Sequence, residues 1–136
     1  MVARRGGKVM LVASTAAFQP GPRMAVYFAT KAYVLSFGEA IAYELRGTGV
    51  KVTVLCPGPT ATNFARIAGM SELTFFNSAG RQVMSAAAVA RLGYRGLKAG
   101  RRVVVTGILN KLTSLGGRFA PRPISLPVTK ALMSRR

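Results

Sequence analysis

Apolar residues follow two kinds of pattern along this chain: short continuous runs and repeats of three to four residues. The continuous runs cover residues 8–14, 50–56 and 101–107. A short run that is apolar at successive positions is typical of a strand buried on both faces, as in a parallel sheet. We therefore predict three strands, the second of which ends at the turn Pro57-Gly58-Pro59.

The repeats predict helices between these strands. Residues 24–46 contain no proline, and large apolar residues recur at helical spacing from Val34 to Leu45, so we expect a long helix that ends at Gly47. Residues 85–97 predict a second helix with Ser85 as its N-cap. Less regular segments predict short helices over 62–70, 109–115 and 127–133 and loops over 15–22 and 74–80.

The order strand, long helix, strand, helix, strand indicates an α/β fold. Helices that alternate with strands are typical of a parallel sheet with right-handed crossovers and three layers. The carboxyl ends of the strands then share one edge, which is where such sheets bind ligands. The loops after Ser14, Cys56 and Thr106 are therefore the places to look for a site.

Composition removes several kinds of chemistry. The chain has no histidine, one cysteine (Cys56) and three acidic residues, all glutamate. This excludes histidine acid–base catalysis and an internal disulfide, and it disfavours zinc sites and paired-carboxylate hydrolysis. Cys56 has apolar neighbours, and we expect it to be unreactive core. A proton donor must come from Tyr, Lys, Ser or Cys.

The formal charge is +17. A basic chain is attracted to polyanions, yet the bases occur singly or in pairs and no nucleic-acid-binding motif accompanies them. We therefore expect no specific nucleic-acid partner, only unspecific contacts at low salt. No apolar run approaches the length that spans a bilayer and no signal peptide is apparent, so we expect a cytoplasmic location.

One group of residues carries recognisable chemistry. Tyr27 and Lys31 stand four residues apart near the start of the long helix, which places both on one face, one turn apart. A fixed positive charge beside a phenol favours the phenolate, and so does the positive end of the helix dipole. Ser14 ends a strand thirteen residues earlier, so the intervening loop can return its hydroxyl to the phenol.

These residues, followed by a strand and Pro57-Gly58-Pro59-Thr60-Ala61-Thr62, resemble the C-terminal half of the short-chain dehydrogenase/reductase family, over about residues 7–106. The resemblance implies a partial Rossmann-like fold and hydride transfer between NAD or NADP and an alcohol or carbonyl substrate. It implies that Tyr27 is the acid/base, that Lys31 favours the phenolate and binds the nicotinamide ribose, and that Ser14 orients the substrate oxygen. Four residues would hold the nicotinamide: Pro57, Gly58, Thr60 and Thr62. For Gly58, we expect that a side chain would obstruct the ring; Thr62 could instead cap a helix.

The chain departs from the family at its start. No glycine-rich turn follows a strand, and the N-terminal nucleotide-binding strands of the family have no counterpart. We therefore interpret residues 1–136 as one truncated domain and expect it to bind cofactor weakly on its own. In the family, the helix corresponding to residues 24–46 often packs against a second subunit, so a homo-oligomer through this helix is expected.

The segment 110–136 has six Lys and Arg residues, no acid and many apolar residues. It could lie weakly on an anionic membrane surface, or it could close over the pocket or cover the sheet edge; the second, structural role is favoured. For the whole chain, the alternative to an oxidoreductase is a non-catalytic fragment or a basic protein that binds anionic lipid or nucleic acid.

Overall fold

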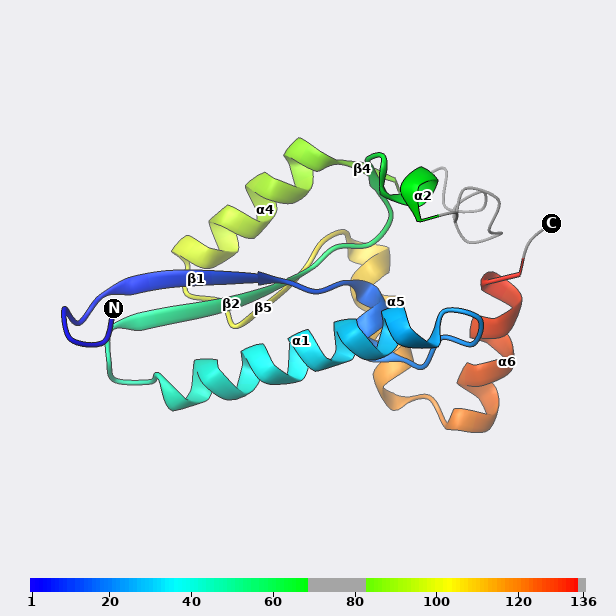
Figure 1. The fold of residues 1–136 in the computed structure, drawn as a ribbon, viewed down its shortest axis with the longest axis horizontal. Coiled ribbons are helices and arrows are strands. Elements are labelled where there is room, and N and C mark those ends of the chain that lie inside the picture. Colours follow the sequence, from blue (N-terminus) through cyan, green and yellow to red (C-terminus); the bar gives the residue numbers. More distant parts are fainter. Residues whose placement is uncertain (69–82, 135–136) are drawn as a thin grey trace.

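Three parallel strands form the centre of the computed structural model, which describes residues 1–68 and 83–134 (Figure 1). In the spatial order β1-β2-β5, they are β1 (Gly7–Val12), β2 (Val50–Cys56) and β5 (Val103–Val105). Helix α1 (Ala25–Glu44) covers one face of the sheet, and helix α4 (Ala86–Lys98) covers the other. The prediction of an α/β fold with a three-layer parallel sheet of about three strands is confirmed.

The central strand β2 holds the best-buried residues. Val54 and Cys56 have no exposed surface, and neither has Thr53, whose hydroxyl donates a hydrogen bond of 2.7 Å to the carbonyl of Arg101. Apolar side chains on both faces and a neighbour on each edge explain why this segment is apolar at almost every position. Strand β1 pairs only with β2 among the described residues, and its register aligns Gly7 with Val50.

Helix α1 forms as predicted, but the repeat from Val34 to Leu45 does not mark its most buried face. The buried residues are Phe28, Leu35 and Gly38, while Phe37 is 46% exposed. The helix is apolar nearly all round, so its sequence alone does not show which face packs on the sheet. It ends near Gly47, which adopts a positive φ of 81° as expected for a helix terminus.

The remaining elements are shorter and less regular than the core. They are the 3₁₀ helix η1 (Thr15–Phe18), the two-residue parallel pair β3 (Thr60–Ala61) and β4 (Met84–Ser85), α2 (Phe64–Ile67), α5 (Ile108–Phe119) and α6 (Arg122–Leu132). The prediction of Ser85 as the N-cap of α4 is confirmed, because its Oγ accepts a hydrogen bond from the N–H of Ala88 at 3.2 Å. The loop predicted over 74–80 lies outside the described residues.

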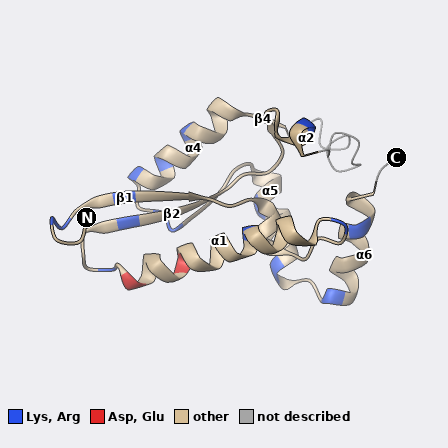
Figure 2. Cartoon of the chain, in the orientation of Figure 1, with Lys and Arg blue, Asp and Glu red and all other residues tan. Residues whose placement is uncertain are grey.

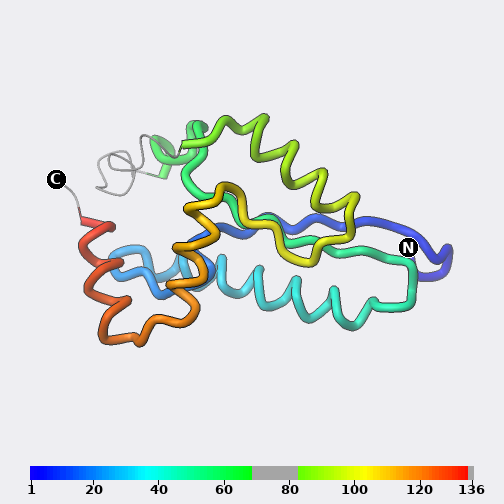
Figure 3. Tube along the Cα trace, turned by 180° about the vertical axis from the view of Figure 1, so that it is seen from behind, coloured from blue at the N-terminus to red at the C-terminus, as the bar shows by residue number. Residues whose placement is uncertain are grey.

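The two C-terminal helices are longer than predicted and have an unusual orientation. They lie at the end of the sheet, beside the start of α1 (Figure 3). Their buried residues are polar or small, namely Asn110, Ser114, Gly117, Ser125 and Thr129. Most of their large apolar residues are exposed, although Leu132 is partly buried, so the buried face of these helices is mainly the polar one.

Charge is distributed over many elements (Figure 2). The two acidic residues of α1 are Glu39 and Glu44, and Glu39 forms an ion pair with Arg102 at 3.4 Å that links α1 to the segment before β5. Lysines and arginines occur on β1, α4, α6 and the loops between them. No helix in the described part of the chain is both long enough and apolar enough to cross a bilayer.

Gly38 tests how tightly α1 packs against the sheet, and Gly116 of α5 is the control. A Cβ at Gly38 would overlap the side chain of Val54, whereas a Cβ at Gly116 would meet no atom within 4 Å. We expect Gly38→Ala to lower the free energy of unfolding by about 1–3 kcal/mol, because α1 must move off the sheet. The matched Gly116→Ala change should raise it by about 0.5–1 kcal/mol, because alanine is the better helix former. Urea denaturation followed by circular dichroism measures both, and equal effects would contradict the packing.

Candidate active site

One pocket lies at the carboxyl ends of the strands. It has a volume of about 860 Å³ and is open to solvent on one side. All seven residues that the sequence singled out line it: Ser14, Tyr27, Lys31, Pro57, Gly58, Thr60 and Thr62. They come from three parts of the chain, namely the end of β1, the first turns of α1 and the segment after β2.

Ser14 is held where the loops after β1 and β2 meet. Its Oγ accepts a hydrogen bond from the N–H of Ala16 at 3.1 Å and donates a long one, 3.5 Å, to the carbonyl of Pro57. The residue is thus the N-cap of η1, one of the ordinary roles of a serine at a strand end. The bond to Pro57 is at the outer limit of hydrogen-bond length, so a ligand oxygen can take over this donor at little cost.

The ring of Tyr27 is fixed by its neighbours. Its centroid lies 6.0 Å from that of Phe28 in an edge-to-face arrangement and 5.7 Å from that of Phe64. It also packs against a small cluster that includes Leu132 and the buried Met133 of the C-terminal end. Residues from α1, α2 and the end of α6 therefore hold the phenol at the pocket wall.

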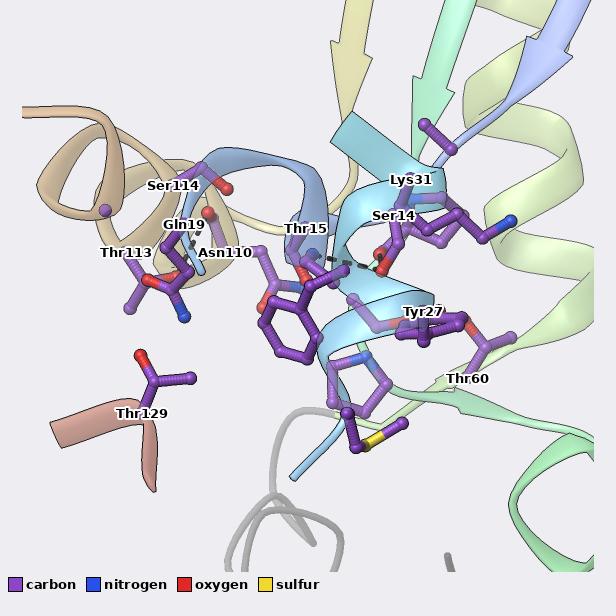
Figure 4. A pocket seen from close by; sticks show the side chains of 18 of the residues that line it. Ser14, Thr15, Gln19, Tyr27, Lys31, Thr60, Asn110, Thr113, Ser114 and Thr129 are labelled. Atoms are coloured by element: carbon purple, nitrogen blue, oxygen red, sulfur yellow. Dashed lines mark hydrogen bonds between the residues drawn. The ribbon is translucent and has the colours of Figure 1, made fainter. Parts of the chain in front are cut away.

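Lys31 lies between this phenol and the end of β1. Its Nζ donates a hydrogen bond of 3.2 Å to the carbonyl of Val12 and lies 5.8 Å from the centre of the Tyr27 ring. The neighbouring Ala13 donates its N–H to Leu55 in β2, so the Val12 carbonyl points to the opposite side, along the edge of β1 away from β2. The ammonium is thereby anchored to the main chain beside the tyrosine (Figure 4).

The segment after β2 is shaped by contacts with its own main chain and with α5. The Thr60 hydroxyl donates to the carbonyl of Gly58 at 3.0 Å, and the N–H of Thr15 donates to the carbonyl of Pro57 at 2.9 Å. A Cβ on Gly58 would overlap the amide of Asn110. Any side chain at this position would therefore displace the Asn110 amide, while the expectation that Gly58 keeps space for a ring stays a prediction.

Thr62 is engaged at the start of α2. Its Oγ1 accepts a hydrogen bond from the N–H of Phe64 at 3.3 Å, while its own residue is exposed. The N-cap of α2 is Asn63, whose side chain makes no capping hydrogen bond, and Thr62 precedes it while its hydroxyl bonds the first N–H of the helix. The residue still contributes to the pocket lining, and the hydroxyl proton has no acceptor among the described residues.

Sequence analysis missed the far wall of the pocket. This wall carries uncharged polar residues from the end of η1 and from α5 and α6: Gln19, Asn110, Thr113, Ser114, Ser125 and Thr129. Figure 4 shows Ser14, Tyr27 and Lys31 on one side of the pocket and Gln19, Thr113, Ser114 and Thr129 on the other. A usable signal was present in the polar residues of 110–129, which recur at three- and four-residue spacing within an otherwise apolar tail.

Cys56 ends β2 directly before the pocket, yet it has no exposed surface. Burial and, to a smaller extent, the nearby Glu39 carboxylate raise the pKa of its thiol to about 12, against smaller opposing effects of the Ser14 backbone and Lys31. A thiol with so high a pKa is neither a nucleophile nor a metal ligand near neutral pH. The structure therefore agrees with a packing role for this residue.

The arrangement as a whole defines a class of protein. A serine and a Pro-Gly segment follow two parallel strands of a Rossmann-like sheet, and the adjacent helix α1 carries a tyrosine with a lysine one turn on. A family model described as short chain dehydrogenase matches residues 1–71, slightly more than half of the chain. The chain belongs to the short-chain dehydrogenase family.

Individual relatives agree with this assignment. The 2,3-dihydro-2,3-dihydroxybenzoate dehydrogenase of Escherichia coli is 39% identical over 69 residues, which are 51% of this chain and 28% of that protein. A 7β-hydroxysteroid dehydrogenase structure superposes with a TM-score of 0.76 at 23% identity, covering 93% of this chain and 49% of the other. A short-chain dehydrogenase from Sphingobium yanoikuyae in complex with NADPH gives a TM-score of 0.67 at 24% identity, covering 85% and 44%. The chain thus spans about half the length of these solved structures, which establish its fold.

The burial of Cys56 gives a test by thiol chemistry. The folded-state pKa of about 12 lies above the ordinary value of 9.0, so at pH 9 we expect iodoacetamide to alkylate the native chain roughly two to three orders of magnitude more slowly than the urea-unfolded chain. Because the folded pKa is the higher one, this group's contribution to stability is complete below pH 9 and is lost as the pH rises toward 12. Mass spectrometry of timed samples measures the rates, and similar rates in both states would contradict the burial.

Proposed function

We propose that this chain supplies the catalytic half of a nicotinamide-dependent oxidoreductase that interconverts an alcohol and a carbonyl compound. The observation that carries the proposal is that Ser14, Tyr27 and Lys31 line one pocket with the Pro57–Thr60 segment, in a chain of the short-chain dehydrogenase family. Few other side chains could act as the proton donor, because the chain contains no histidine and no pair of neighbouring carboxylates. Tyr27, which lines this pocket, is then the proposed proton donor.

Each residue has a role that its position permits. In the reducing direction, the Tyr27 hydroxyl gives its proton to the carbonyl oxygen of the substrate while a hydride adds to the carbonyl carbon. The Ser14 hydroxyl turns from its long contact with Pro57 and donates to the same oxygen, which fixes the substrate and stabilises the developing negative charge. The Lys31 ammonium, anchored on Val12, favours the phenolate that remains.

The residues present fit the nicotinamide end of NAD or NADP. Pro57, Gly58, Thr60 and Thr62 form one wall of a pocket of about 860 Å³, which leaves room for a ring and a substrate side by side. When bound, the cofactor supplies or accepts the hydride. The NADPH complex of the Sphingobium yanoikuyae relative supports this assignment. The Thr62 oxygen accepts a hydrogen bond from the N–H of Phe64, and the O–H of the same hydroxyl can still donate to a carboxamide oxygen.

The catalytic assignment is tested by two tyrosines on the same helix. Tyr27→Phe removes the pocket hydroxyl, whereas Tyr33→Phe removes one from a side chain that is 68% exposed and does not line the pocket. In the intact protein, we expect Tyr27→Phe to lower kcat for ketone reduction by about 10²–10⁴-fold, because a positioned acid contributes that much, and Tyr33→Phe to leave it unchanged.

Circular dichroism should show the same fold for both tyrosine variants, because neither change removes packing volume beyond one oxygen. Full turnover by Tyr27→Phe would exclude the proposed acid/base role. Equal losses in the two variants would point to a defect of the helix and not of the chemistry.

Helix α1 supports a homo-oligomer. It exposes several large apolar side chains, namely Val26, Tyr33, Phe37 and Tyr43, and Tyr33 stacks on Phe37 with ring centroids 5.9 Å apart. Several large apolar side chains exposed on one helix are costly to leave in water. Pairing of this helix with its copy in a second subunit would cover it.

A weak contact of the 110–136 segment with anionic membranes is the second candidate. One face of α5 carries Ile108, Leu112, Leu115 and Phe119, each between 58% and 80% exposed, and Lys111 and Arg118 flank this face. Apolar residues beside bases suit the boundary between acyl chains and anionic headgroups. This contact is compatible with the opposite face of the helix lining the pocket.

Vesicle co-sedimentation tests the membrane contact. We expect the chain to sediment with vesicles of 30% phosphatidylserine in roughly 50 mM salt and less so as salt rises, because the attraction is screened. Phe119→Ser and Leu112→Ser should weaken sedimentation, whereas Val26→Ser, at a residue of α1 that is 78% exposed, should not. Unchanged sedimentation of both α5 variants would exclude this surface as the membrane contact.

A further inference from the structure

The far wall of the pocket is polar but carries no charge. Among the described lining residues, Lys31 is the only one with a charged side chain, and it lies on the side of Ser14 and Tyr27 (Figure 4). The opposite wall offers amides and hydroxyls from the end of η1, from α5 and from α6. A carboxylate or phosphate would find no cation there, whereas a neutral hydrogen-bonding group would find several partners.

Gln19 is the best-placed of these partners. Its side chain rests against α5 at Gly117, where the absence of a Cβ leaves the space that the amide occupies. The amide has two N–H donors and a carbonyl acceptor, and none of them forms a hydrogen bond within the described part of the chain. A half-buried amide at a pocket wall therefore retains its full capacity to bind a ligand group.

Two serines of the same wall are also without partners. The hydroxyl oxygens of Ser114 and Ser125 are buried and make no hydrogen bond with the described residues, and the two residues are only 5% and 6% exposed. A buried polar group without a partner costs stability, so its presence calls for an explanation. A serine hydroxyl is redirected by rotation about a single bond, which allows a group in the pocket to become its partner.

The nearby threonines differ from the serines in this respect. Thr113 donates its hydroxyl proton within α5, to the carbonyls of Leu109 and Asn110, and Thr129 donates to the carbonyl of Ser125 at 2.8 Å. Their oxygens can still accept a hydrogen bond from a ligand. The wall as a whole can therefore both donate to and accept from a group such as an alcohol, a ketone or an amide.

Much of the remaining pocket lining is apolar. It includes Phe28, Ala16, Val128, Leu132 and Met133. A pocket with polar residues on two opposite sides and an otherwise largely apolar lining suits an elongated ligand with an apolar body and a polar group at each end.

We propose that Gln19 and Ser114 determine substrate specificity by binding an uncharged hydroxyl or carbonyl group at the end of the substrate remote from the reacting carbon. The substrate class is accordingly an elongated, mostly apolar ketone or alcohol with a second neutral oxygen function. This inference rests on the proposed function for the chemistry at the near end, but not for the binding at the far end.

The test compares three ketones of one shape in the intact protein with its reduced cofactor. They are 4-cyclohexylcyclohexanone, its 4′-hydroxy derivative and its 4′-carboxylate derivative. We expect kcat/KM for the hydroxy ketone to exceed that of the plain ketone by about fivefold or more, which is what one new neutral hydrogen bond provides, and the carboxylate to show no gain.

Three variants identify the residues responsible. Gln19→Met keeps the size of the side chain and removes its polar groups, and Ser114→Ala removes an unpartnered hydroxyl. Both should reduce the preference for the hydroxy ketone over the plain ketone toward onefold. Ser36→Ala, at an exposed position of α1 outside the pocket, is the matched control and should keep the preference. The Tm of Ser114→Ala should not fall, because no hydrogen bond is lost.

The outcomes separate this inference from the proposed function. Turnover of all three ketones without a preference, a preference that both variants retain, or a gain for the carboxylate would overturn the inference and leave the function standing. If no ketone is turned over, saturation-transfer NMR with the plain and hydroxy ketones measures binding alone. Tighter binding of the hydroxy ketone that Gln19→Met abolishes would support the inference without the function, and equal binding would overturn it.

Discussion

The parallel pairing of β1 with β2 is the constraint on which the site depends. The ladder continues past the ends of both strands, because the N–H groups of Ala13 and Thr15 donate to the carbonyls of Leu55 and Pro57. Ser14 lies between these two bonds, so its hydroxyl is fixed beside the Pro57 segment. The same strand end provides the Val12 carbonyl that holds the Lys31 ammonium. A shift of one residue in this register would turn Ser14 away from the pocket and remove the anchor of Lys31.

The parts of the fold that the sequence predicted well are those in which local pattern and burial agree. Strand β2 is apolar on both faces because it is the central strand, and the limits of α4 follow from a serine cap that the sequence displays. Ser14, Tyr27 and Lys31 could be predicted to share one pocket because a strand end and the first turns of the following helix are close in space. Their roles stay predictions.

The remaining differences have physical causes that a single sequence does not display. Helix α1 is apolar nearly all round, so the choice of Phe28, Leu35 and Gly38 as its inner face depends on what the sheet offers. The close approach of Asn110 to Gly58 joins positions more than fifty residues apart. Most of all, α5 and α6 bury hydroxyls and an amide and expose their large apolar residues, which contradicts the usual expectation for an amphipathic helix. That inversion gives the pocket its polar far wall and gives the outer surface its apolar character.

A structure of the intact protein with NADP and a bound ketone tests the central claim most directly. The account predicts that the carbonyl oxygen lies within about 3 Å of both the Tyr27 hydroxyl and the Ser14 hydroxyl, with Ser14 released from the Pro57 carbonyl. A carbonyl oxygen bound by other groups, with Ser14 still turned toward Pro57, would contradict it.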